Sequence, residues 1–336
     1  MKILIATGIY PPQIGGPAQY AKELTEALKK LGDEVKVCTY GGEKKLPTGL
    51  RHVAFLGKIL PAYFKADYII VLDTFSVALP VYLASFIFNK SYIVRVGGDF
   101  LWESFVERIG QKVLLRNFYQ TTRGEWNQKE KFIFYITKKI LRRAEKIVFT
   151  TGWQQDIWQP VYELKNYKIN IIENYYGPKD STKDDGDNES QKIFLAGTRK
   201  LKWKNLSTLT QAFSLAQKKD PLLKLDLTNV NYDDFIIKMK HSQAVILVSL
   251  GDVSPNMILD AVRLNKPFIL TRETGLYDRL KEVGLFVDPL NEAEIADAIL
   301  TLSNPEEYKK WQTKVREFNF VHLWEDIALE FKALMS

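Results

Sequence analysis

The sequence predicts an α/β protein with two domains, each a doubly wound parallel sheet covered by helices. Short apolar runs alternate with amphipathic stretches along the chain, which is the pattern of parallel strands joined by crossover helices. The length of 336 residues is more than one hydrophobic core usually organises and fits two domains. A polar and acidic stretch without apolar spacing interrupts the alternation near the middle, at residues 177–190. Its composition predicts an interdomain linker, or else a flexible insert, between a domain at 1–176 and another at 191–317.

The first half contains five apolar runs with the length of buried parallel strands, at residues 2–6, 34–39, 68–72, 92–96 and 146–150. An amphipathic helix should run from about Pro17 to Leu31, because its apolar side chains recur on one face. The longest apolar stretch, Tyr68–Phe88, is interrupted by Asp73 and Pro80. These interruptions favour a buried strand followed by a buried helix over a membrane span.

In the second half, residues 248–271 combine the end of an apolar strand, a turn, a helix and a further strand. Ser254 and Pro255 indicate where the helix begins, because Ser is a preferred N-cap and Pro fits the first helical position. Asp252 precedes this start, and Asp260 lies eight residues after Asp252. Free N–H groups at a helix start attract anions, and carboxylates beside them can accept hydrogen bonds from sugar hydroxyls. The pattern leaves an alternative equally open, in which Asp252 only balances the helix dipole and Asp260 is a solvated helix residue.

Two cations follow the strand that we expect at residues 192–197. Arg199 and Lys204 lie just beyond its end, where they suit a diphosphate through charge-assisted hydrogen bonds. The alternative is a basic surface loop. In the first half, Gly15 and Gly16 precede a helix and would let the backbone approach a ligand closely. They do not form the GxGxxG motif, so a dinucleotide site is not indicated.

Asp99 is the best placed polar residue after the strand at residues 92–96, where the chain reads GGDFLWE. Ligands of doubly wound sheets bind beyond the carboxyl ends of the strands, which makes Asp99 a candidate catalytic residue and Glu103 a second choice. A loop-capping role fits Asp99 equally well.

These motifs together resemble those of the family 4 glycosyltransferases, which are retaining enzymes with the two-domain GT-B fold. Their donor-site signature, often EGFPNxxLEAxxxxKPxI, is similar to DVSPNMILDAVRLNKPFIL here, with both glutamates replaced by Asp252 and Asp260. The family's Arg, four residues, Lys, then Gly or Asn is matched by Arg199, Lys204 and Asn205. Its YPPxxGG loop is similar to residues 10–16, and the resemblance spans nearly the whole chain.

The resemblance implies two Rossmann-like domains facing a cleft, with a last helix at about 318–336 that packs back on the first domain. It also implies a glycosyltransferase of the hexosyltransferase type, which moves a sugar with retention from a nucleotide sugar and requires no metal or other cofactor. Asp252 would meet the hydroxyls of the donor sugar and would be catalytic together with Asp99, whereas Asp260 would meet the ribose. The donor-binding residues would be Gly15, Gly16, Arg199, Lys204, Asp252, Ser254, Asn256 and Asp260.

Three departures from the family pattern keep other functions open. The chain has no histidine after an early strand, both signature acids are shortened, and one βα unit is missing before the acidic motif. These departures favour a catalytically inactive nucleotide-sugar-binding protein as the alternative. A nucleotide-sugar epimerase of the same fold is a further alternative. Residues 185–187 read DGD, formally the metal motif of another glycosyltransferase fold, but their place in the expected linker argues against a metal site.

The basic residues concentrate in one part of the first half. Residues 101–146 contain eleven basic and five acidic side chains, which accounts for most of the net charge of +7. Because residues 129–146 interleave cations with apolar side chains, we expect this stretch to rest on an anionic membrane surface, which would suit a lipid-linked acceptor. The alternative is a solvated helix whose apolar side is core. No nucleic-acid motif accompanies the charge.

The composition also bears on location and acceptor. The single cysteine, Cys38, has no partner for an internal disulfide and indicates a reducing, cytoplasmic location, which a peripheral position at the inner face of the membrane would also satisfy. The expected acceptor is a glycan, such as a polysaccharide, or a lipid-linked sugar of cell-envelope glycan synthesis.

Overall fold

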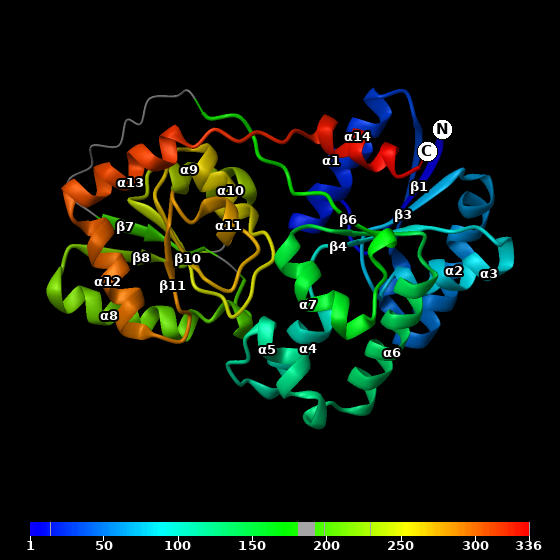
Figure 1. Cartoon of the computed structure of the whole chain (residues 1–336), viewed down its shortest axis with the longest axis horizontal. Coiled ribbons are helices and arrows are strands. Elements are labelled where there is room, and N and C mark those ends of the chain that lie inside the picture. Colours follow the sequence, from blue (N-terminus) through cyan, green and yellow to red (C-terminus); the bar gives the residue numbers. More distant parts are fainter. Residues whose placement is uncertain (14, 181–191, 198, 229, 336) are drawn as a thin grey trace. The chain divides into compact units, whose positions relative to one another are not determined.

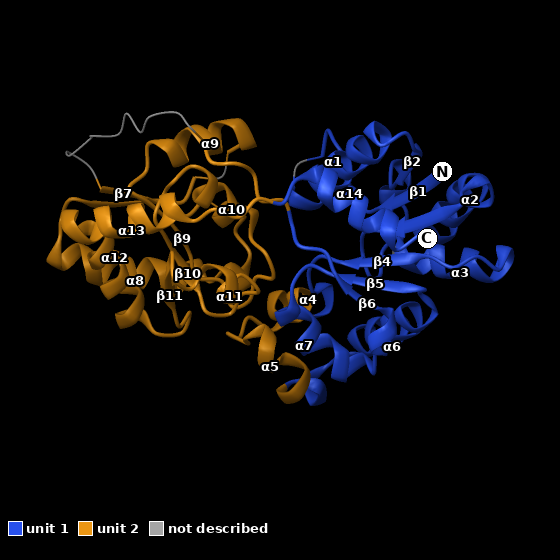
Figure 2. Cartoon of the chain, turned by 45° about the horizontal axis from the view of Figure 1, so that its top comes forward, with its two compact units in different colours: residues 1–101, 122–174, 322–336 blue, residues 102–121, 175–321 orange. Residues whose placement is uncertain are grey.

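The computed structural model describes residues 1–13, 15–180, 192–197, 199–228 and 230–335. The chain divides into two compact units, coloured separately in Figure 2. Unit 1 contains Met1–Leu101, Thr122–Asn174 and the segment from His322 onward, and unit 2 contains Trp102–Thr121 and Tyr175–Val321. The segment Trp102–Thr121 therefore belongs to unit 2, although the residues on both sides of it belong to unit 1.

Unit 1 is built on a parallel sheet of six strands in the order β2-β1-β3-β4-β5-β6. The strands are β1 (Lys2–Thr7), β2 (Glu34–Thr39), β3 (Tyr68–Val71), β4 (Ile93–Val96), β5 (Lys146–Phe149) and β6 (Ile169–Ile171). All four residues of β4 are buried, as expected for a parallel strand covered on both faces. The predicted strands and their parallel arrangement are confirmed.

Helices connect these strands and cover the sheet (Figure 1). They are α1 (Gly16–Lys30), α2 (Thr48–Lys65), α3 (Ala78–Phe88), α6 (Gln128–Arg143), α7 (Gly152–Tyr162), α14 (Trp324–Ala333) and the start of α4 (Phe100–Ile109). Asn127 and Glu130 form a capping box at the start of α6. The last helix, α14, packs on α1, where the Trp324 ring lies 5.1 Å from the Tyr20 ring.

Unit 2 is built on a parallel sheet of five strands in the order β11-β10-β9-β7-β8. The strands are β7 (Lys192–Leu195), β8 (Leu223–Asp226), β9 (Ala244–Leu247), β10 (Phe268–Thr271) and β11 (Leu285–Val287). The helices are α5 (Leu115–Thr121), α8 (Leu206–Lys219), α9 (Tyr232–Lys240), α10 (Asn256–Arg263), α11 (Tyr277–Leu280), α12 (Glu292–Ser303) and α13 (Pro305–Glu317), with the remainder of α4.

Each face of this second sheet has its own apolar core. Phe194 and Ile246 belong to the core that α8 and α12 cover, whereas the next residues along the strands, Leu195 and Leu247, belong to the core with α10. Successive side chains of a strand point to opposite faces, so both faces of the sheet are covered. Unit 2 is therefore doubly wound, as the sequence predicts.

Two expectations need comment. Helix α10 begins at Asn256 and Pro255 occupies its N-cap position, so the predicted cap at Ser254 is wrong by one position. Most of the expected linker, residues 181–190, lies outside the described residues, and so does the DGD sequence. Residues 177–180 are held by unit 2, because the Lys179 ammonium donates to the carbonyl oxygens of Val262 and Val315 at 2.7 and 2.5 Å.

Cys38 is buried in β2, as expected for a structural thiol. Among the helices that the structure describes, none combines the length and apolarity needed to cross a membrane.

Candidate donor-binding site in unit 2

Two loops at one edge of the second sheet carry the predicted cation and acid. Strands β7 and β9 are parallel neighbours, so the loops that follow them leave the sheet at the same edge. The Lys204 ammonium in the first loop lies 2.6 Å from the Asp252 carboxylate in the second. The two side chains are only 12% and 14% exposed. The structure therefore brings together two residues that the sequence separates by 48 positions.

Asn205 fixes the end of the first loop. Its backbone adopts a left-handed conformation with φ of 59°, which asparagine tolerates better than most residues. The buried side-chain amide donates to the carbonyl oxygens of Val248 and Pro289 at 3.0 and 2.7 Å, and the Thr208 hydroxyl donates to its oxygen at 2.6 Å. The loop that carries Lys204 is thus tied to the chain that follows β9 and to the chain that follows β11.

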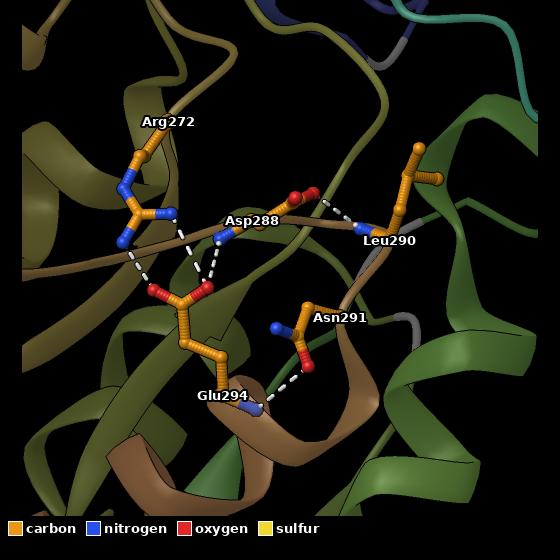
Figure 3. A network of polar contacts seen from close by, with 5 residues as sticks. All are labelled: Arg272, Asp288, Leu290, Asn291 and Glu294. Atoms are coloured by element: carbon orange, nitrogen blue, oxygen red, sulfur yellow. Dashed lines mark hydrogen bonds and ion pairs between the residues drawn. The ribbon is translucent and has the colours of Figure 1, made fainter.

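A second network holds the chain that follows β11 (Figure 3). Arg272 forms an ion pair with Glu294 on α12, and the Asp288 backbone N–H donates to the same carboxylate at 3.2 Å. Asn291 caps α12 by accepting from the Glu294 N–H at 3.1 Å. Because Pro289 follows Asp288 directly, this network also positions the carbonyl that accepts from Asn205.

The Trp203 ring packs against the Lys204 ammonium. The nitrogen lies 4.2 Å from the centre of the indole ring, within the range of a cation–π interaction. The Trp203 carbonyl accepts from the Leu250 N–H at 2.9 Å, which connects the two loops through their backbones.

Asp260 lies on α10 and has two partners. The Tyr232 hydroxyl donates to its carboxylate at 2.9 Å, and the Arg263 guanidinium lies 3.6 Å from it. Burial raises the pKa of Asp260, whereas the Tyr232 hydrogen bond and the Arg263 charge act in the opposite direction. Sequence reasoning missed Tyr232, because nothing in the local pattern links the start of α9 to α10.

The other predicted donor residues differ in exposure. Arg199 is exposed, and within the described part of the chain its guanidinium forms no ion pair. Ser254 is half-buried in the turn before α10, and Asn256 is exposed at the first residue of that helix. Helix α10 has eight residues. The free backbone N–H groups of its first turn can attract an anion.

The second sheet ends at β8, which is its edge strand. A shallow hollow of about 500 Å³ lies along this strand. Its polar lining comes from Lys200, Lys224, Asp226 and Thr228, and its apolar lining includes Leu225 and Leu227. Lys200 belongs to the same loop as Arg199 and Lys204, so the hollow begins where that loop leaves the sheet.

In unit 1, Gly15 and Gly16 lie where the sequence predicts, at the start of α1. Gly15 has a φ of 149°, a conformation that side chains disfavour, and its carbonyl accepts from the Ala18 and Gln19 N–H groups. Among the described residues no side chain caps this helix start, so the helix presents only backbone groups here.

The structure gives Asp99 a structural environment. The residue is 1% exposed, and the Trp158 indole N–H donates to its carboxylate at 2.9 Å. A group that touches a sugar must be reachable from solvent, so this geometry favours the loop-holding alternative for Asp99. Among the described residues, no cluster of three or more His, Cys, Asp or Glu side chains is arranged to hold a metal ion.

Arg95 is a buried cation that sequence reasoning missed. Its guanidinium lies 3.6 Å from the centre of the Tyr20 ring and donates to the Asn174 side chain at 2.7 Å and to the Thr150 hydroxyl at 3.3 Å. The signal was present in the sequence, because an arginine interrupts the otherwise apolar strand IVRV. Its contacts join β4 to β5 and to the last residue of unit 1 before the chain enters unit 2.

Two parallel sheets with helices on both faces, one sheet in each unit, form the two-domain α/β GT-B fold of glycosyltransferases. The chain is similar to sucrose-phosphate synthase from Thermosynechococcus elongatus, with 14% identity and a TM-score of 0.72 over 99% of this chain and 98% of that one. It is also similar to HepE from Anabaena in complex with UDP and glucose, with 15% identity and a TM-score of 0.69 over 99% and 98% of the two chains. The catalytic domain of starch synthase IV from Arabidopsis thaliana, bound to ADP and acarbose, has 12% identity and a TM-score of 0.67 over 99% and 98%. A scan against protein-family models finds no match, and neither does a search of curated proteins.

Proposed function

We propose that this protein is a glycosyltransferase that moves a sugar from a nucleotide sugar to a glycan or lipid-linked acceptor, with retention. The observation that carries the proposal is the Lys204–Asp252 pair at the carboxyl edge of the second sheet, in a chain with the GT-B fold. A sheltered cation can neutralise a diphosphate, and a carboxylate beside it can accept hydrogen bonds from sugar hydroxyls. The solved structures with UDP and ADP support a nucleotide at such a site.

In the proposed reaction, the leaving diphosphate develops negative charge as its bond to the sugar breaks. Lys204, Arg199 and the N–H groups at the start of α10 would stabilise this charge, and such electrostatic stabilisation is usually the largest contribution to catalysis. Ser254 and Asn256 would contact the phosphates or the sugar from the turn before α10. The cations and N–H groups together would serve without a metal ion.

The remaining residues would orient the donor. Asp252 would exchange its ion pair with Lys204 for hydrogen bonds to the sugar, and Asp260 would accept from the ribose hydroxyls. Gly15 and Gly16 would present backbone to the sugar or phosphates. For Asp99 we propose a positioning role through Trp158, because its carboxylate is buried.

Donor turnover tests the proposal and separates it from its alternatives. Purified protein is incubated with UDP, ADP and GDP sugars, with and without a panel of glycan and lipid-linked acceptors, and the products are followed by mass spectrometry. We expect transfer that requires an acceptor and that is lost in Lys204→Ala but kept in Lys218→Ala, an exposed lysine of α8. Tight donor binding without any product would indicate the inactive binding protein, and conversion of the donor without acceptor would indicate the epimerase.

For the membrane partner, we propose a surface that differs in part from residues 129–146. Within residues 129–146, the side chains of Ile133, Ile140 and Leu141 are buried and form part of the core. Phe132 and Tyr135 remain exposed. Exposed apolar side chains also occur on α3, which packs against α6, and on α2, which packs against α3.

We define an aromatic–basic face by three exposed rings of these helices and the cations beside them. Lys90 lies 5.9 Å from the Phe64 ring, Arg143 lies 4.6 Å from the Phe86 ring, and Lys139 lies 4.5 Å from the Tyr135 ring. Exposed Ile87 lies next to Phe86 in α3. Rings that insert at the level of lipid headgroups and cations that attract anionic lipids are the two components of interfacial binding.

The charged side chains of helices α2, α3 and α6 are almost all basic. Helix α3 carries no charged residue, and α2 carries basic residues only. Helix α6 carries one acid, Glu130, and its carboxylate is occupied by the capping box. Phe64, Phe86 and Arg143 lie in the last turns of their helices. Because these helix ends lie near the amino ends of the strands that follow them, this part of the face is at the opposite edge of the sheet from Gly15. A membrane contact here would leave the carboxyl edge of the sheet accessible.

Vesicle flotation tests this partner. We expect the protein to float with vesicles that contain anionic lipid at low salt, and to float much less when Phe86 and Ile87 are both replaced by Ser. Leu329→Ser is the matched control, because Leu329 is an exposed apolar residue on α14. Equal recovery with neutral and anionic vesicles would rule out the proposed partner.

A further inference from the structure

One segment from the first half of the sequence packs inside unit 2. Trp102–Thr121 comprises most of α4 and all of α5, and Figure 2 shows α5 coloured with unit 2. Trp102 and Leu115 are almost fully buried, at 2% and 1% exposure. The Trp102 indole N–H donates to the Val113 carbonyl at 2.9 Å. This bond joins the start of the segment to the chain between α4 and α5.

The segment contacts the loop that carries Lys204. The Trp102 ring lies 5.6 Å from the Trp203 ring, which is the ring beneath the Lys204 ammonium. The Lys202 backbone N–H donates to the Glu107 carboxylate at 2.6 Å, and the Lys202 ammonium donates to the Glu107 carbonyl at 2.6 Å. Two residues immediately before Lys204 are therefore held by α4.

The segment also contacts the loop that carries Asp252. The Leu115 N–H donates to the Leu250 carbonyl at 3.1 Å. Residue 251 must be glycine here, because a Cβ atom on it would lie 2.6 Å from the Leu115 Cβ and 3.2 Å from the Trp102 ring. The loop before Asp252 thus lies directly against the segment.

The segment is also connected to Asp252 through Glu273. The Asp252 N–H donates to the Glu273 carbonyl at 2.9 Å, and the Arg116 guanidinium forms an ion pair with the Glu273 carboxylate at 3.3 Å. Glu273 is buried, and burial disfavours its charged form. The Arg116 cation from this segment compensates that charge.

We infer that Trp102–Thr121 is a positioning element of the donor site, which holds the loops of Lys204 and Asp252 at the separation that a sugar diphosphate requires. This inference rests on the proposed function and adds to it a set of residues that do not touch the donor. The element contacts residues 202, 203, 250, 251 and 273. All of them lie within two positions of Lys204 or Asp252, or bond directly to Asp252. Binding groups held only by flexible loops lose affinity when their spacing is not fixed.

A change at Glu107 offers a test, because positioning and electrostatics predict opposite changes in diphosphate affinity. Glu107→Ala removes a negative charge near the proposed phosphate site, so by electrostatics alone it would strengthen diphosphate binding. If Glu107 positions the loop, the same change releases the Lys202 N–H and weakens diphosphate binding. We expect calorimetry to show a three- to tenfold (about 0.7–1.4 kcal/mol) loss of affinity for UDP or ADP, with unchanged affinity for the matching nucleoside.

Two further variants complete the design. Glu107→Gln keeps an oxygen that accepts from the Lys202 N–H, so it should restore wild-type diphosphate affinity. Gly251→Ala changes no charge and should weaken diphosphate binding, because its methyl group displaces the loop from Leu115. Glu282→Ala, at an exposed acid of unit 2, controls for the loss of one negative charge. Thermal unfolding of each variant is measured alongside.

The outcomes separate this inference from the proposed function. If the wild-type protein binds no nucleoside diphosphate, the proposed function fails and the inference fails with it. If the wild type binds but Glu107→Ala binds equally well or more tightly, the positioning role is overturned while the donor site stands. A Glu107→Gln variant as weak as Glu107→Ala would also overturn it, because the hydrogen-bond acceptor would then be irrelevant.

Discussion

The Lys204 ammonium and the Asp252 carboxylate form a 2.6 Å ion pair. In the proposed donor site, both residues would give up this pair in order to bind a donor. A phosphate would compete with Asp252 for Lys204, and a sugar hydroxyl would replace Lys204 at Asp252. The pair thus keeps two desolvated charges compensated while the site contains no donor. This exchange makes the two residues respond differently to mutation.

For Lys204→Ala, we expect the affinity for nucleoside diphosphates to fall at least tenfold, because a charged hydrogen bond contributes about 1.5–3 kcal/mol. For Asp252→Asn, we expect diphosphate affinity to be kept or increased, because the ammonium is released, while discrimination between donor sugars and most turnover are lost. Calorimetry with diphosphates and with nucleotide sugars measures both. A parallel loss of diphosphate affinity in the two variants would contradict the exchange.

Arg199 should contribute in a more salt-dependent way than Lys204. Its side chain is exposed, whereas Lys204 is largely buried, and salt screens exposed charges much more strongly. We expect the effect of Arg199→Ala on diphosphate affinity to shrink markedly between about 50 mM and about 500 mM salt, and the effect of Lys204→Ala to persist. If the loss of diphosphate affinity depended on salt to the same extent in both variants, this difference between Arg199 and Lys204 would be contradicted.

Asp260 should distinguish ribose from deoxyribose. Asp260→Asn should weaken every ribonucleotide ligand but lose little against the 2′-deoxy analogue, where the hydrogen bond is already absent. An unpaired buried hydroxyl costs about 1–3 kcal/mol, so the contrast should be about tenfold or more. Tyr232→Phe is the matched variant, because it keeps the ring and removes only the hydroxyl that occupies Asp260. Equal weakening of both ligand forms in Asp260→Asn would make it a helix-surface acid only.

Lys179 should make the stability of the protein depend on pH in the alkaline range. Burial lowers the pKa of Lys179 to about 8, below the ordinary lysine value of about 10.4. Between these two values the unfolded chain binds more protons than the folded one, so stability rises with pH across that window. Urea unfolding at about pH 7 and about pH 10 should show this rise in the wild type and not in Lys179→Met. Lys218→Met, at an exposed position of α8, should behave like the wild type.

The sequence was sufficient to predict the fold because its signals are local. The run YIIV is apolar on both faces, which only a covered parallel strand tolerates, and it forms β3. The same reasoning placed Lys204 and Asp252 each beyond the end of a strand, and they lie at one sheet edge because those two strands are parallel neighbours. The position of α10 differed by a single residue, because helix starts are set by cap geometry that Ser254 and Pro255 could each satisfy.

The contacts that complete the candidate site could not be predicted in this way. The hydrogen bond from Tyr232 to Asp260 joins positions 28 residues apart, and neither strand nor helix periodicity encodes it. The Trp158 indole N–H that donates to Asp99 belongs to α7, 59 positions further along the chain. The association of residues 102–121 with unit 2 depends on side-chain fit against Gly251, and the composition of the segment resembles that of its neighbours.

The origin of Trp102–Thr121 in the first half of the chain also has a consequence for synthesis on the ribosome. Arg116 and Glu273 are 157 residues apart, so the segment emerges long before the strands it packs against. At translation rates of roughly 5–20 residues per second, Trp102 and Leu115 stay without their native neighbours for on the order of ten seconds. During that interval the nascent chain exposes apolar side chains that the finished protein buries.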